Sequence, residues 1–291
     1  MRILICGGTG QLGQDCTRVF NKNHSVQSFG SRDLDISDPD LVERTIRELA
    51  PEVVINCAAY TNVDGCEDNR DHAFHVNAVG AENLARSCRT VDALMVHIST
   101  DYVFDGKKEP PLTYAETDPT APLNVYGASK LEGEKRVAAL LEKQIIVRTA
   151  WLYGAQGNNF IKTILKLTLG NPEKTIRVVD DQFGSPTWTL RLALQLERLV
   201  EADGRGIFHA TAEGYCSWYE FATYFLKKMD VSHNIIACTT QEYPLPATRP
   251  FNSILDNARL KQKNMNRMTG WRHGVDLFVS RFRQELLDEC S

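Results

Sequence analysis

The sequence predicts an α/β protein built on a doubly wound parallel sheet, with a smaller C-terminal lobe. Short apolar runs alternate with helix-like stretches through the first half of the 291-residue chain. The runs are apolar at successive positions, as expected for strands covered by helices on both faces of a sheet. A glycine-rich turn joins the first run to the first helix-like stretch. With 43% hydrophobic residues, the chain can bury a large core.

Five strands and four helices are expected in the first half of the chain. The second of these helices follows Ser37-Asp38-Pro39, which offers a capping side chain and a proline for the first turn. Regular alternation of strand and helix is typical of the Rossmann-type architecture. The strands are expected at 3–6, 25–29, 53–57, 94–99 and 145–149, and the helices at 11–21, 41–49, 71–88 and 123–141.

The pattern loosens after about Tyr153, where prolines punctuate the chain. We predict one large unit over residues 1–153 and a smaller lobe over residues 154–291, from which some segments return to the main sheet. In this second part, helices are expected at 159–167, 190–201 and 218–229.

Composition excludes several classes of protein. The net charge of −4 leaves no basic surplus for a nucleic-acid polymer. No apolar run reaches the roughly 18–20 residues that span a bilayer, and the apolar stretch at the start is too short for a signal peptide. Eight scattered cysteines without a Cys-x-x-Cys pair favour reduced thiols over a disulfide framework or a metal site. We therefore expect a cytoplasmic enzyme without a membrane partner.

The first motif that carries chemistry is the glycine spacing Gly7, Gly10 and Gly13 between the first strand and the first helix. Glycine permits a tight turn and lets the backbone approach a pyrophosphate. The N–H groups and positive dipole end of the following helix then face that anion. An ordinary strand–helix turn is the alternative. The position of the motif at the start of an alternating pattern favours dinucleotide binding, so we assign NAD(P) binding to residues 1–153 and mainly substrate binding to residues 154–291.

The end of the second strand bears on the choice of cofactor. An acidic residue there would hold the ribose diol of NAD, but this chain has Ser31 and Arg32 after Gly30. A hydroxyl and a guanidinium can bind a 2′-phosphate, which favours NADPH. A solvated surface arginine is the alternative, and Asp33 keeps NADH open.

Tyr126 and Lys130 form the candidate catalytic pair. Residues four apart lie above one another on one face of a helix. An ammonium beside a phenol favours the phenolate, so we expect Lys130 to lower the pKa of Tyr126. Such a phenol can donate a proton to a carbonyl oxygen while hydride arrives at the carbon. Taken alone, the spacing favours the alternative of a packed tyrosine beside a solvated lysine.

Neighbouring strand ends favour the catalytic interpretation. The fourth strand ends in Ser99-Thr100, and hydroxyls at the carboxyl end of a parallel strand face the ligand crevice. These groups can therefore join Tyr126 and Lys130 around one carbonyl. The third strand ends near Ala58 and Ala59, which are small enough to let a ribose and a nicotinamide pass.

Together these segments resemble the extended short-chain dehydrogenase/reductase family, and within it the sugar-nucleotide branch of the dTDP-4-dehydrorhamnose reductases. The resemblance covers nearly the whole chain. The runs at residues 181–187 and 249–253 lie outside any general dinucleotide fingerprint and therefore point to the sugar-nucleotide branch. The similar runs are Gln11-Leu12-Gly13, Asp35-Ile36-Ser37-Asp38, residues 58–64, 99–106 and 148–154, and in the second half residues 181–187 and 249–253.

The resemblance implies a role for each matching position. Tyr126 is implied as the proton donor, Lys130 as the group that binds the ribose and tunes Tyr126, and Thr100 as a hydrogen-bond partner of the substrate oxygen. Substrate contacts are implied for Thr100, Asp101, Tyr126 and Trp151, which would flank the sugar ring. The positions implied to line the cofactor are Gly10, Gln11, Leu12, Asp35, Ile36, Ala59, Tyr60 and Thr61.

The implied reaction is NADPH-dependent reduction of dTDP-4-dehydro-6-deoxy-L-mannose to dTDP-L-rhamnose. Dehydratases of the superfamily carry two acidic residues after the threonine of the fourth strand, whereas Thr100-Asp101-Tyr102 supplies one, which favours simple reduction. Another nucleotide-sugar reductase or epimerase, or a non-catalytic NADP-binding regulatory subunit, stays an alternative. Mg²⁺-linked dimers occur in this branch, and Asp15 falls at one acidic position, but no full ligand set matches. A homodimer stays open, and no metal ligand is assigned.

Overall fold

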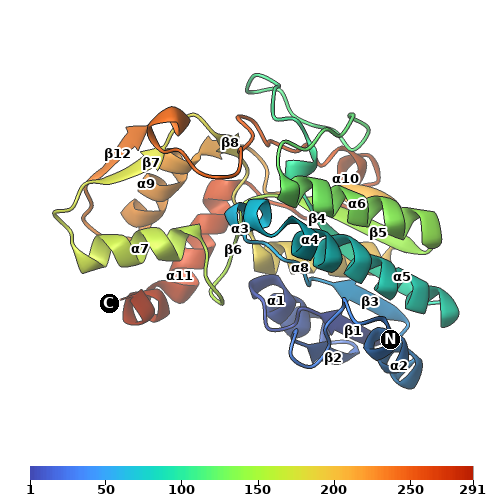
Figure 1. The fold of residues 1–291 in the computed structure, drawn as a ribbon. Helices are drawn as coiled ribbons and strands as arrows, with labels where there is room; N and C mark the ends of the chain where they lie inside the picture. The colour runs from blue at the N-terminus through green and yellow to red at the C-terminus, as the bar shows by residue number, and fades with distance from the viewer. Residues whose placement is uncertain (291) are drawn as a thin grey trace.

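The central feature of the fold is a six-stranded parallel sheet, seen in a computed structural model that describes residues 1–290 (Figure 1). The strand order is β10-β5-β4-β3-β1-β2, so the chain reverses direction across the sheet between β1 and β3. The doubly wound prediction is confirmed. The strands are β1 (Arg2–Cys6), β2 (Ser25–Phe29), β3 (Val53–Asn56), β4 (Leu94–Thr100), β5 (Gln144–Thr149) and β10 (Gly206–His209).

Helices cover both faces of this sheet, each over its own apolar core. One face is covered by α1 (Gln11–Phe20) and α8 (Thr189–Glu201), whose buried side chains pack on alternate strand residues such as Ile3 and Ile5. The other face is covered by α2 (Pro39–Leu49), α5 (Ala81–Thr90) and α6 (Val125–Leu140). Because β3 and β4 are buried along their whole length, their sequences read as continuous apolar runs rather than as alternating ones.

The expected cap of the second helix is confirmed. The Asp38 carboxylate accepts hydrogen bonds from the backbone N–H groups of Asp40 and Leu41, and Pro39 occupies the first turn. The helix ends at Ala50, which adopts a left-handed φ of 42°. This short helix therefore begins and ends at residues that the sequence identifies.

The helix expected over 71–88 is not continuous. It begins earlier, as α3 (Val63–Asp68) and α4 (Arg70–Phe74), passes through a π-helical segment at His75–Gly80, and continues as α5. Asn62 starts α3, because its side chain accepts a hydrogen bond from the Gly65 N–H. A π-helical turn inserts an extra residue, and such turns are frequent at functional sites. This one carries Asn77, whose contacts are described below.

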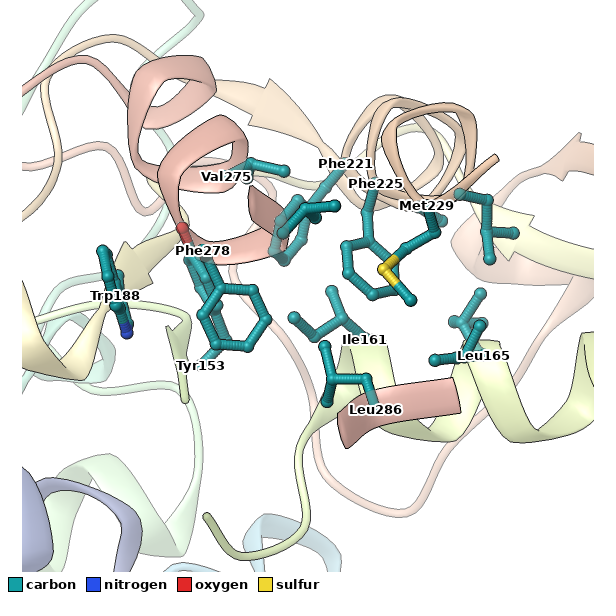
Figure 2. Packing of buried hydrophobic residues seen from close by; sticks show 14 of the residues in the cluster. Tyr153, Ile161, Leu165, Trp188, Phe221, Phe225, Met229, Val275, Phe278 and Leu286 are labelled. Carbon is teal, nitrogen blue, oxygen red and sulfur yellow. The ribbon is translucent and has the colours of Figure 1, made fainter. Parts of the chain in front are cut away.

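The second lobe has a core of its own, built from α7 (Phe160–Gly170), α9 (Trp218–Met229) and α11 (Trp271–Cys290) (Figure 1). Figure 2 shows its aromatic centre, where Tyr153 and Phe278 lie between residues of these helices. A two-stranded parallel sheet of β7 (Ile176–Val179) and β12 (Ile235–Cys238) borders the lobe. The sequence did not predict α11, although it is the longest helix among residues 1–290.

Two segments from the second half lie against the main sheet. Strand β10 pairs in parallel with β5, and α8 packs against α1. Two pairs of short strands follow the end of β5, and the first of them joins the two parts of the chain. They are β6 (Leu152–Tyr153) with β9 (Thr187–Trp188), and β8 (Phe183–Gly184) with β11 (Cys216–Ser217), and α10 (Ala258–Gln262) packs near β10.

No helix within residues 1–290 is both long enough and apolar enough to cross a membrane.

Candidate active site

A cavity of about 670 Å³ opens at the carboxyl ends of the central strands. Open α/β proteins bind their ligands at this edge of the sheet, and the cavity lies beside the point at which the strand order reverses. Residues from the glycine loop, the ends of β3, β4 and β5, and the start of α6 meet there. The predicted site residues in its lining are Gly10, Gln11, Leu12, Gly13, Ala59, Thr61, Thr100, Asp101, Tyr126, Lys130 and Trp151.

The glycine loop forms a cradle that larger residues would fill. Gly7 has a φ of +74°, and a Cβ atom added there would lie 2.6 Å from the Ala58 nitrogen. A Cβ atom added at Gly13 would lie 2.2 Å from the Gly7 oxygen. Gly10 precedes α1 and offers no capping side chain, so the N–H groups of the first turn are left for a ligand. These features fit a pyrophosphate group, as the spacing predicted.

The end of β2 lies directly beside this loop. The Gly8 N–H donates to the Phe29 oxygen over 2.8 Å, and a Cβ atom at Gly30 would lie 2.7 Å from the Thr9 side chain. The next residues, Ser31 and Arg32, are exposed and lie outside the cavity lining. Their position beyond the glycine loop is compatible with contact to the adenosine end of a dinucleotide.

Asp35 and Ile36 also lie outside the cavity lining. The Asp35 carboxylate accepts hydrogen bonds from the Ser37 N–H over 2.9 Å and from the Ser37 hydroxyl over 2.7 Å, and these bonds lower the pKa of Asp35. Ile36 is buried, and its side chain packs against Gly80 of the π-helical segment. Asp35 therefore shapes its own turn and stays ionised at neutral pH.

The segment after β3 is held by two asparagines. The Ala58 N–H donates to the Asn56 side chain over 3.1 Å, and the Tyr60 N–H donates to the Asn77 side chain over 2.8 Å. The Asn77 amide in turn donates to the Tyr60 oxygen over 3.1 Å and to the Ser129 hydroxyl on α6 over 2.9 Å. Sequence reasoning missed Asn77, because inside an expected regular helix it reads as one more polar residue.

Helix α6 places Tyr126 and Lys130, the candidate catalytic pair, at the edge of the cavity. Its N-cap is Asn124, whose side chain accepts a hydrogen bond from the Gly127 N–H over 2.8 Å. Tyr126 is in the first turn and Lys130 follows one turn later. A Cβ atom at Gly127 would lie 2.1 Å from the Tyr102 oxygen, so glycine is what allows the helix to approach the segment after β4 this closely.

The structure corrects the expected effect of Lys130 on Tyr126. Burial, and next to it the Asp101 carboxylate, raise the pKa of Tyr126 above its usual value. The Lys130 ammonium is buried and donates to the Ile98 oxygen over 2.7 Å rather than to the phenol. Burial lowers the pKa of Lys130 to about 8. At neutral pH the protein therefore presents Tyr126 as a neutral phenol, the form that can donate a proton.

Thr100 and Asp101 form a hydrogen-bonded pair beside that phenol. The Thr100 hydroxyl donates to the Asp101 carboxylate over 2.8 Å and accepts from the Tyr102 N–H over 3.2 Å. A hydrogen bond with Thr100 lowers the pKa of Tyr126 and opposes the effect of burial. Asp101 is only 3% exposed, and burial raises its pKa to about 6. The site therefore holds a second acidic group with an unusual pKa, as active sites often do.

The Trp151 ring is closely packed by neighbouring residues. Trp151 adopts a φ of +48°, and its ring stacks on Trp218 with 3.5 Å between ring centroids and 6° between planes. Gly184 is also close to this ring, because a Cβ atom added there would lie 2.4 Å from it. Trp151 lines the cavity, so its expected place beside the sugar ring stays a prediction. Sequence reasoning placed Trp218 on a helix but not at the site.

A second cavity, of about 850 Å³, lies between α7, β7 and residues 240–249. It shares Tyr102, Phe160 and Trp218 with the first cavity, so the two adjoin at these three aromatic side chains. Three basic side chains, Lys174, Arg177 and Arg249, are in its lining. The resemblance over residues 181–187 and 249–253 was the signal in the sequence for this region, since Gln182 and Arg249 line the cavity.

Arg249 is fixed by Asp64. The guanidinium donates to the two carboxylate oxygens over 2.6 and 2.7 Å, and this pairing lowers the pKa of Asp64. Arg249 and Asp64 stand far apart in the sequence, and their bidentate bond ties the second lobe to α3 at the mouth of the cavity.

The described residues offer no obvious metal site. Within residues 1–290 there is no group of three or more His, Cys, Asp or Glu side chains that could hold a metal ion. The Asp15 carboxylate accepts hydrogen bonds from Arg18, over 2.7 Å, and from Thr189. All eight cysteines are free thiols, as the sequence indicated.

Comparison with known proteins gives one consistent match. The family described as RmlD substrate binding domain matches residues 1–284. A dTDP-4-dehydrorhamnose reductase of Burkholderia thailandensis is 38% identical over 96% of this chain and 98% of its own length. A crystal structure of a dTDP-4-dehydrorhamnose reductase from Clostridium acetobutylicum is 41% identical, covers 97% of this chain and 100% of its own, and has a TM-score of 0.93. The same enzyme of Bacillus anthracis, in complex with NADP, is 38% identical with a TM-score of 0.92, covering 96% of this chain and 99% of its own.

Proposed function

The chain belongs to the RmlD substrate binding domain family, and on that premise we propose that it is an oxidoreductase that reduces dTDP-4-dehydrorhamnose to dTDP-L-rhamnose with NADPH. The observation that carries this proposal is the meeting of Tyr126, Thr100 and Lys130 with the glycine loop in one cavity. A second cavity of nucleotide size adjoins the first.

The proposed cofactor is NADPH, which supplies the hydride when bound. Its pyrophosphate fits the glycine loop and the first turn of α1, where Gly10, Gln11, Leu12 and Gly13 line the cavity. Ser31 and Arg32 would hold the 2′-phosphate, and Lys130 would bind the nicotinamide ribose. The NADP complex of the Bacillus anthracis relative supports this choice. Residues 1–153 would form most of this half of the site.

The proposed proton donor is Tyr126. When a hydride reaches a ketone carbon, the oxygen becomes an alkoxide unless a donor neutralises it in the transition state. Burial keeps the Tyr126 phenol protonated, and Thr100, adjacent on β4, offers a hydroxyl to the same oxygen. In the structure that hydroxyl donates to the buried Asp101 carboxylate over 2.8 Å, so it would exchange this hydrogen bond for one to the substrate oxygen when substrate binds. These three groups suffice for reduction of a carbonyl.

The sugar and the nucleotide are assigned to different cavities. The keto sugar would lie in the first cavity beside Tyr126, with the edge of Trp151 and the indole of Trp218 against it. The diphosphate would pass the aromatic junction into the second cavity, where Lys174 offers positive charge and Arg177 is held in a salt bridge with Glu242. Charge-assisted bonds from such side chains are the usual means of holding a diphosphate.

A cytoplasmic location stays a prediction, and so does any homodimer. Mg²⁺ is not part of the proposal.

The proposal is tested by incubating the purified protein with NADPH and a panel of nucleotide-linked 4-keto sugars, followed by product identification. We expect NADPH oxidation and dTDP-L-rhamnose from dTDP-4-dehydrorhamnose, with slower turnover when the nucleobase or the sugar stereochemistry is changed. Binding of NADPH without oxidation of it by any member of the panel would point to a non-catalytic role. An epimerised sugar without net NADPH consumption would point to an epimerase.

A further inference from the structure

A buried ion pair lies behind the catalytic residues, outside the lining of both cavities. Glu134 on α6 and Arg148 on β5 are each only 3% exposed. The Arg148 guanidinium donates to the two Glu134 carboxylate oxygens over 2.9 and 2.7 Å. A buried pair of this kind often stabilises a fold no better than apolar residues would. Stability alone therefore does not account for a buried ion pair at this position beside the active site.

The pair connects three elements at positions next to the site. Glu134 lies one helical turn after Lys130 on α6. The Ser99 hydroxyl, directly before Thr100 on β4, donates to the Glu134 carboxylate. Arg148 directly precedes Thr149, which lines the cavity. Loss of either member of the pair would therefore first change the surroundings of Lys130 and Thr100.

Lys130 has charged or titratable neighbours on several elements. Glu134 on its own helix and Cys57 after β3 favour its protonated form, while burial opposes it. His97 on β4 is also near enough for Lys130 to lower the pKa of that imidazole. Arg148 on β5 completes this set, because it binds the carboxylate of Glu134, which lies one helical turn after Lys130 on α6.

Glu134 and Lys130 have separate hydrogen-bond partners. Glu134 uses its two carboxylate oxygens for Arg148 and Ser99, while Lys130 donates to the Ile98 backbone oxygen. Glu134 therefore acts on the ammonium as a charge held at a distance. Without Arg148, the carboxylate would be free to turn towards the ammonium and bind it directly.

We propose that Glu134 and Arg148 are a balanced pair of positioning residues for Lys130: Glu134 holds a negative charge one helical turn from the ammonium, and Arg148 keeps Glu134 from binding that ammonium directly. The inference rests on the proposed role of Lys130 in binding the cofactor ribose. It assigns a task to two residues that touch neither cavity.

The test is the Kd of NADPH measured by fluorescence titration as a function of pH, without substrate. In the parent protein, affinity should fall as pH rises through about 8, where Lys130 loses its proton. In Glu134→Gln the negative charge is gone and Arg148 remains, so the pH at which NADPH affinity decreases should be about one unit lower than in the parent. In Arg148→Met the Glu134 carboxylate has lost its partner and is free to bind Lys130, so the pH at which NADPH affinity decreases should be about one unit higher than in the parent. Affinity at pH 7 should then be several-fold weaker, because the ammonium is drawn to Glu134.

Opposite shifts are the signature of the proposal, because a general loss of packing would move both variants in the same direction. Each single variant leaves a buried charge unpaired, so thermal unfolding is recorded for both to confirm that they fold. The double variant Glu134→Gln/Arg148→Met buries no unpaired charge and should return the pH dependence towards that of the parent. Glu132→Gln, which removes a surface partner of Arg136 on the same helix, is the matched control and should change nothing.

Shifts in one direction for both single variants would overturn the proposal, as would unchanged pH profiles in folded proteins. Lys130→Met should abolish the pH-dependent step. If the step persists in Lys130→Met, the proposed ribose contact itself is wrong. Since substrate is absent throughout, the result is independent of which sugar nucleotide the enzyme reduces.

Discussion

At the scale of single residues, the protonation of Tyr126 is the main consequence of the local structure. A reductase needs a donor that keeps its proton until the carbonyl oxygen gains charge. Burial favours the neutral phenol, and the Thr100 hydrogen bond moderates that effect. The sequence identified the residue but not its environment. The contact between Lys130 and the Ile98 oxygen depends on the packing of α6 on β4, which a spacing of four residues does not contain.

Replacing Tyr126 with phenylalanine keeps the ring and removes only the hydroxyl. We expect kcat to fall by about 10²–10⁴-fold, the usual range for a positioned acid, with the Kd of NADPH nearly unchanged. Thr100→Val should cost less, because it removes a hydrogen bond and no proton donor. Steady-state kinetics and cofactor titration check both. A folded Tyr126→Phe protein with near-normal turnover would refute the assignment.

Asp101 gives a prediction about stability and pH. Its pKa is about 6 in the folded protein, above the ordinary value of 3.8, so the folded state binds the proton more tightly than the unfolded state. Stability from this group is therefore fully present below about pH 4 and is lost as pH rises to about 6. The shift corresponds to about 3 kcal/mol in the free energy of unfolding.

Denaturant unfolding of the parent and of Asp101→Asn between pH 4 and 7 measures this effect. The difference in unfolding free energy should change by roughly 3 kcal/mol in favour of the variant as pH rises across that range. A difference that stays constant with pH would show that Asp101 titrates normally in the folded protein.

Arg32 is the residue that we expect to set cofactor preference. It follows β2 beside the glycine loop, and its side chain is exposed and available to a 2′-phosphate. Arg32→Ala should raise the KM for NADPH by about tenfold, the value of one charge-assisted hydrogen bond, and leave that for NADH nearly unchanged. Comparable increases for both cofactors would count against the assignment.

At the scale of elements, the sequence predicted helices and strands best where the pattern is local. The cap of α2 and the strand ends around the glycine loop were identified from neighbouring residues. The π-helical segment was not, because the contacts of Asn77 with Tyr60 and Ser129 become visible only when three elements are packed. Helix α11 was missed because Gly274 and mixed charges obscure its periodicity, while its burial against α7 and α9 is a tertiary property.

Helix α9 contributes Trp218, which we expect to matter for substrate rather than cofactor. The residue stacks on Trp151 and stands at the junction of the two cavities, so its indole is placed to contact the sugar and the diphosphate end of the nucleotide. Trp218→Ala should raise the KM for the sugar nucleotide about tenfold or more, since an aromatic contact of roughly 1–3 kcal/mol is removed. The Kd of NADPH should stay near normal. Trp188→Phe, a buried tryptophan of the same lobe, is a control for packing. Parallel losses of cofactor and substrate binding in Trp218→Ala would indicate a structural role instead.

At the scale of the whole molecule, the fold class could be predicted because alternation, burial and the glycine loop all specify the same parallel sheet. The second cavity could not, since it is assembled from α7, β7 and residues 240–249, which have no common sequence pattern. The ion pair of Asp64 with Arg249 could not be predicted either, because the two residues are distant in the sequence. Family resemblance over residues 249–253 identified part of this region where periodicity could not.

The central claim is that this molecule transfers a hydride from NADPH to the C4 carbonyl of a nucleotide-linked sugar. The most direct measurement uses NADPH deuterated at the transferred position, with dTDP-4-dehydrorhamnose in ordinary water, and locates the label in the product by NMR. We predict one deuterium at C4 of dTDP-L-rhamnose and none elsewhere on the ring. A product without deuterium at C4, or no product while NADPH remains bound, would contradict it.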